Sequence, residues 1–183
     1  MLTIKESIKL EKLIRMYEKL SYSQLLDISA AALNRLKPLL LRMPQEVNAG
    51  LYFAAISSSA VGADGSISYK EIKFMNETLK KAYGADTDTS LSVLYSIIKG
   101  SKIRISDLIK EAKTTAAMCN VNENDILTLL SMYGEFGEKL ANQLYDFAND
   151  DEQLDILTIV LCVLSVDGDI DHTETKFLKR LLD

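Results

Sequence analysis

The apolar residues of this chain recur mostly at intervals of three or four, which is the period of an amphipathic α-helix. The first clear stretch runs from Leu10 to Leu20, with Lys, Arg and Glu residues on its opposite side. Ser21 and Ser23 mark a break and a new N-cap. A further break is expected at Pro38, a helix end at Gly84, and a short extended connector at Ile103-Arg104-Ile105. Further helices are predicted at about 22–43, 45–63, 69–83, 90–99, 106–119, 122–133 and 134–149, followed by two that flank an Asp-Gly loop after residue 150.

One motif in the chain occurs twice, 103 residues apart. Asp64-Gly65 opens the first copy and Asp167-Gly168 opens the second. Aligned without a gap, residues 62–79 and 165–182 share seven of eighteen residues. The repeat predicts an all-α helical bundle with an internal duplication of an apolar helix, an acidic Asp-Gly loop and an amphipathic helix.

The charge of the chain is distributed unevenly. Residues 1–45 carry eight Lys/Arg against four Asp/Glu, a charge of +4, whereas residues 46–183 carry thirteen against twenty-two, a charge of −9. We therefore divide the chain into a basic helical N-terminal extension, 1–45, and an all-helical domain, 46–183. The acidic body argues against nucleic acid as a partner. The basic extension is either a solvated helix face or a surface for a protein partner or a membrane.

The hydrophobic pattern also argues against a transmembrane segment. The most apolar run, 156–166, is about half as long as a helix that crosses a bilayer. Charged residues interrupt the N-terminal segment, so no signal peptide is predicted. We expect a cytoplasmic protein.

The two acidic loops match only half of a calcium-binding EF-hand. With Asp64 or Asp167 at position 5 of that loop, Gly, Ile and Glu follow at positions 6, 8 and 12 in both copies. Positions 1 and 3 are not carboxylates in either copy, so an ordinary EF-hand is rejected. A metal site would need a different arrangement that joins acids of the loop and the following helix, or of both copies.

A metal-free interpretation accounts for the same residues. Ser68-x-x-Glu71 and Asp171-x-x-Glu174 fit the capping box that begins many helices, and Asp-Gly is a common turn. The second copy, however, concentrates four carboxylates within eight residues, and these repel one another unless they are solvated, screened by a cation or held by a basic partner. His172 beside them is either a further ligand or solvated.

At these residues the chain resembles the TerB-like proteins of bacterial tellurite resistance, over about residues 46–183. That family is all-helical and carries an Asp-Gly-x-Ile/Val-Ser/Asp-x-x-Glu motif in two halves. The resemblance implies a non-enzymatic module that binds a divalent metal and takes part in stress-response assemblies, often near the membrane. It implies Asp64, Glu71, Asp167 and Glu174 as metal ligands, to which the local charge adds Asp169 and Asp171.

Three functions are compared on this basis. The first is a TerB-like module that binds Ca²⁺, Mg²⁺ or Mn²⁺, without an organic cofactor, and acts with protein partners. The second is a metal-free helical adaptor that binds proteins through its acidic pole and its basic N-terminal helices. The third, an enzyme, is disfavoured because the chain has one His, no Ser–His–Asp or Cys–His set, and no phosphate-binding Gly-rich loop.

Overall fold

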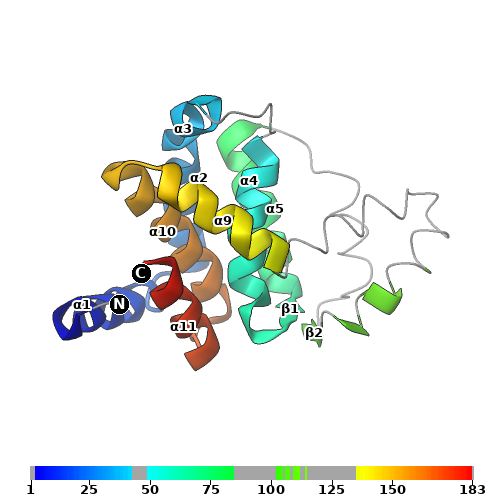
Figure 1. The fold of residues 1–183 in the computed structure, drawn as a ribbon. Helices are drawn as coiled ribbons and strands as arrows, with labels where there is room; N and C mark the ends of the chain where they lie inside the picture. Colours follow the sequence, from blue (N-terminus) through cyan, green and yellow to red (C-terminus); the bar gives the residue numbers. More distant parts are fainter. Residues whose placement is uncertain are drawn as a thin grey trace.

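The computed structural model describes residues 3–42, 49–84, 102–104 and 135–182, with short pieces at 106–107, 109–111 and 114. This part of the protein is a bundle of α-helices with one pair of short strands (Figure 1). The all-α prediction is therefore confirmed. The helices predicted at 90–99 and 122–133 lie outside the described residues, as does the predicted boundary between residues 45 and 46.

The helices follow the hydrophobic pattern closely. They are α1 Ile4–Tyr17, α2 Tyr22–Arg35, α3 Lys37–Arg42, α4 Ala49–Val61, α5 Tyr69–Tyr83, α9 Glu135–Phe147, α10 Asp150–Leu164 and α11 His172–Leu181, with 3₁₀ turns η1 Gly62–Asp64 and η2 Ser165–Asp167.

The ends of the first helices are set by local polar bonds. α1 begins earlier than the periodic stretch at Leu10, because Thr3 and Glu6 form a capping box there. Ser21 caps α2, as predicted. α2 ends before Leu36, and Pro38 lies in the first turn of α3, where a missing N–H is tolerated. The predicted break near Pro38 is confirmed.

α10 lies in the middle of the bundle. Every residue from Asp155 to Ser165 is buried, and α10 packs against α2 and α4 with further contacts to α1, α5, α9 and α11. α9 crosses α4, whose Ser57, Ser58 and Ala60 are small and buried and so allow a close approach (Figure 1).

The N-terminal helices belong to the same hydrophobic core as the rest of the chain. Leu25, Leu33, Leu36 and Leu39 are each at most 2% exposed and pack in one cluster with the apolar residues of α10. The described part of the predicted extension, residues 3–42, therefore shares its core with the predicted domain.

Two arginines of this region also bind acids near the start of α10. Arg35 Nε and Nη2 bind Asp155, at 2.6 Å for the shortest contact, and Arg42 Nη2 contacts both carboxylate oxygens of Glu152 at 2.7 Å. The acids are largely buried while the arginines remain half exposed. These pairs let the polar end of α10 enter the bundle because each buried carboxylate has a cationic partner.

Only one of the two strands lies where the sequence predicts extended structure. β2, Lys102–Arg104, overlaps the predicted connector, and β1, Ser66–Ser68, lies in the first Asp-Gly loop. The strands pair antiparallel, with Ile67 opposite Ile103. Among the described helices, none combines the length and the apolar character needed to cross a membrane.

The shared core predicts that α2 is required for stability. Leu33→Ala should lower the free energy of unfolding by about 2–5 kcal/mol, because it leaves a cavity at a fully buried position. The matched control is Leu41→Ala, because Leu41 is 87% exposed on α3. This variant should change the free energy of unfolding by less than about 0.5 kcal/mol. Urea titration of both variants measures the difference, and equal values would show that α2 is not part of the core.

Candidate functional site

The first acidic loop is a tight turn organised by Asp64. α4 ends in η1, and Gly65 follows with a φ of 79°, in the left-handed region that favours glycine. The Asp64 carboxylate accepts hydrogen bonds from the Ser66 N–H and Ser66 Oγ, both at 2.8 Å. Asp64 therefore orients the start of β1.

The second loop repeats this local structure but is more exposed. α10 ends in η2, and Gly168 again has a positive φ, of 105°. The three aspartates of this loop, Asp167, Asp169 and Asp171, are all exposed. Asp171 Oδ1 accepts from the N–H groups of Thr173 and Glu174, at 2.7 and 2.8 Å, and so caps α11.

Both loops end in a capping box whose glutamate is buried. The Ser68 N–H donates to Glu71 Oε2 at 2.6 Å, and the Asp171 N–H donates to Glu174 Oε2 at 2.8 Å. Glu71 is 3% exposed and Glu174 is 6% exposed. The predicted boxes are confirmed, and they place one carboxyl of each copy inside the protein.

The two copies lie against each other in the fold. α5 contacts η2, and α11 contacts η1, so the exit helix of each loop touches the turn of the other. Lys70, next to Glu71, reaches Asp167 of the opposite loop, with 4.0 Å between Nζ and Oδ1. Residues about 100 positions apart in sequence thus form one region at the lower end of α4, α5 and α10 (Figure 1).

This arrangement strongly perturbs one carboxyl. Burial raises the pKa of Glu71 to about 8, against an ordinary value of 4.5. The hydrogen bonds from Ser68 oppose this shift, while the negative charges of Asp167 and Glu174 add to it. The pKa of Glu71 therefore depends on the charges of two acids in the other copy.

The structure brings some of the predicted ligands together and leaves others apart. Glu71, Asp167 and Glu174 interact electrostatically, and Asp64 lies at the neighbouring turn η1, which α11 contacts. Asp169 is exposed and Asp171 serves as a cap, while His172, the first residue of α11, is exposed. Within the described residues, no three His, Cys, Asp or Glu side chains are gathered closely enough to hold a metal ion as they stand.

Two residues of this region were not predicted from the sequence. Lys70 occupies a motif position that is Thr173 in the second copy, so the difference between the copies could have pointed to it. Glu18, which follows α1, accepts a hydrogen bond from the Ile170 N–H at 3.1 Å. That bond joins residues 152 positions apart, and no local pattern indicates it.

Comparison with known proteins adds no assignment. The chain matches no protein-family model, and neither the curated proteins nor the solved structures include a match.

The raised pKa of Glu71 predicts a pH dependence of stability. Between pH 4.5 and about 8 the folded protein holds a proton on Glu71 that the unfolded chain releases. Stability should therefore fall as the pH rises through this window, by up to about 1.4 kcal/mol per pH unit from this group.

Glu71→Gln removes the titration and keeps an oxygen that can accept from Ser68. Its free energy of unfolding should fall less with rising pH than that of the parent protein. Glu11→Gln, on the exposed side of α1, serves as the control and should leave the parent slope unchanged. Parallel pH profiles for the parent and Glu71→Gln would contradict the raised pKa.

Proposed function

We propose that this protein is a non-enzymatic, TerB-like module that binds a divalent cation between its two acidic loops and acts in stress-response assemblies of the tellurite-resistance type. The observation that carries the proposal is the burial of Glu71 within electrostatic reach of Asp167 and Glu174 of the other copy. A cation drawn between them would offset the repulsion that Glu71 experiences from these two acids and the desolvation of the buried carboxyls.

The internal duplication is part of this proposal. Each unit consists of an apolar helix, a 3₁₀ turn, a left-handed Gly and a helix that begins with a capping box. The reciprocal contacts of α5 with η2 and of α11 with η1 support a pseudo-two-fold relation between the units. A site between the loops would then receive equivalent acids from both.

The chemistry of the side chains indicates the class of metal. All six proposed ligands, Asp64, Glu71, Asp167, Asp169, Asp171 and Glu174, are carboxylates, and carboxylate oxygens suit the hard cations Ca²⁺, Mg²⁺ and Mn²⁺. Glu71, Asp167 and Glu174 would form the inner part of the site. Lys70 competes with a cation for Asp167, so binding would displace its ammonium group.

A specific observation favours a second candidate, the metal-free adaptor. Asp64 orients its own turn, Asp171 caps α11, and Glu71 and Glu174 complete capping boxes, so these acids already have structural roles. The exposed acids of the second loop would then contact a basic partner, together with the basic N-terminal helices. This adaptor predicts salt-sensitive capture of proteins and a melting temperature that does not respond to metals.

The metal proposal predicts a rise in melting temperature with Ca²⁺, Mg²⁺ or Mn²⁺, because a ligand that binds only the folded state stabilises it. At a concentration one hundred times the dissociation constant, the gain is about 2.7 kcal/mol. Asp167→Asn combined with Glu174→Gln should abolish the rise. Asp146→Asn combined with Asp151→Asn removes two exposed acids of α9 and α10 and should preserve it. Flat melting curves with all three ions would refute the metal site.

Cation binding should also release protons near neutral pH, because a carboxylate must be deprotonated to ligate a metal and Glu71 holds its proton up to about pH 8. Calorimetric titration in two buffers of different ionisation enthalpy measures the protons released. We expect up to one proton per cation at pH 7 and tighter binding as the pH rises towards 8. Glu71→Gln should lose this release, whereas a pH-independent affinity in the parent would exclude Glu71 as a ligand.

A further inference from the structure

The outward face of α1 carries a continuous cationic surface, which we call the outer stripe. The residues of the stripe recur at intervals of one or three, so the helical period places them on one side of α1 and the turn that follows it. All are exposed. They are Lys5, Ile8, Lys9, Lys12, Arg15, Met16 and Lys19.

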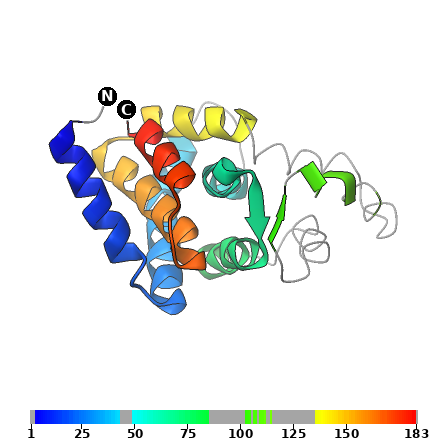
Figure 2. The same ribbon diagram turned by 90° about the horizontal axis from the view of Figure 1, so that it is seen from below.

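The opposite side of α1 fixes the direction in which the stripe points. Leu10, Ile14 and Tyr17 are at most 7% exposed and pack on the core. Figure 2 shows α1 along the outer edge of the bundle, on the side away from β1 and β2. The stripe therefore faces away from the protein.

Within the described part of the chain, the charges of the stripe are opposed only weakly, by the electrostatic interaction of Lys9 with Glu6. Among the described residues, none of its five cations forms an ion pair with a carboxylate. The acids of α1 lie elsewhere: Glu6 binds the start of the helix, and the helical period puts Glu11 on its flank. Five like charges along about 20 Å of helix create a local positive field on a protein whose remaining chain is acidic.

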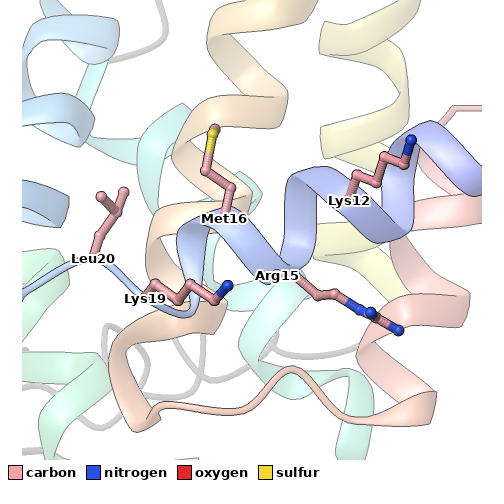
Figure 3. Close-up of a pocket in the computed structure, with 5 residues that line it drawn as sticks. All are labelled: Lys12, Arg15, Met16, Lys19 and Leu20. Atoms are coloured by element: carbon pink, nitrogen blue, oxygen red, sulfur yellow. The ribbon is translucent and has the colours of Figure 1, made fainter.

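Two apolar side chains interrupt the cations. Ile8 is 49% exposed and Met16 is 53% exposed, although both belong to a helix whose apolar side is otherwise buried. Met16 and Leu20 line a shallow depression together with Lys12, Arg15 and Lys19 (Figure 3). The surface thus combines exposed apolar side chains with positive charge.

The residue types distinguish between an anionic bilayer and a folded acidic protein. At its largely buried carboxylates, Asp155 and Glu152, the chain uses arginine, whereas its lysine–carboxylate pairs, such as Lys70 with Asp167, are more exposed. The stripe instead has four lysines and one arginine on a convex helix surface. Lysine point charges match mobile lipid phosphates, and exposed Ile and Met side chains can enter the boundary between headgroups and acyl chains.

We propose that the outer stripe of α1 docks the protein on the surface of a bilayer that contains anionic phospholipids. The lysines and Arg15 contact headgroup phosphates, while Ile8 and Met16 enter the interface. The acidic loops take no part in this contact, so docking and the proposed cation site stand or fall separately.

The first test is co-sedimentation of the full chain with vesicles of phosphatidylcholine, with or without phosphatidylglycerol, in the presence of a chelator of divalent cations. The protein should bind the anionic vesicles and not the neutral ones, and salt should weaken binding. Lys12→Gln combined with Arg15→Gln should reduce the partition coefficient about 30-fold, which corresponds to about 1 kcal/mol for each charge removed.

The matched charge control is Lys139→Gln combined with Lys176→Gln, which removes two exposed cations from α9 and α11. It should bind as the parent does, and circular dichroism checks that both double variants are folded. An equal loss of binding in the control would show that only net charge matters. Equal binding of the parent to neutral vesicles would also overturn the proposal.

The second test addresses the apolar residues. Ile8→Ser combined with Met16→Ser should weaken binding roughly fivefold or more and make the remainder more sensitive to salt, because only the electrostatic attraction is left. Leu154→Ser, at a 59% exposed position of α10, should have no effect. If Ile8→Ser with Met16→Ser retains full binding and polyglutamate displaces the protein from vesicles, the stripe is a site for acidic polypeptides and the lipid assignment fails.

Discussion

The complete burial of α10 from Asp155 onward is the constraint on which the rest of this structure depends. A helix without a solvated side between Asp155 and Ser165 needs neighbours in every direction, and α2, α4, α9 and the other helices supply them. Its polar beginning can enter the bundle only because Arg35 and Arg42 bind the acids there. Its end leads directly into η2, which places the second acidic loop against α5.

The acidic region combines a structural role with an unfavourable charge arrangement. A capping box normally lies at a solvated helix end, where an ionised glutamate costs little. Here the glutamates of the α5 and α11 boxes are buried, and each exit helix contacts the turn of the other copy, so the bonds that begin both helices also hold Glu71 near Asp167 and Glu174. Helix capping and ligand binding are therefore compatible functions of the same carboxyls, since each glutamate has a second oxygen.

Much of the fold could be predicted from the sequence, because caps, glycines and apolar periodicity act locally. Ser21, Gly84 and the two capping boxes were identified from a few neighbouring residues. The proximity of the loops could not be predicted in this way, because it depends on how α10 and α5 pack. For the same reason the contact of Lys70 with Asp167, the pairing of β1 with β2, and the bond from Ile170 to Glu18 were missed.

The hydrogen bond between Glu18 and Ile170 connects the end of α1, which carries the cationic outer stripe, to the second acidic loop. Glu18 directly follows α1, and the Ile170 N–H that it binds lies in the middle of the second acidic loop. Movement of α1 would alter the backbone of that loop, and reorganisation of the loop would alter the end of α1. A free energy of coupling between two such surfaces is reciprocal. If binding at one surface strained this hydrogen bond and so weakened binding at the other, the reverse effect would have the same size.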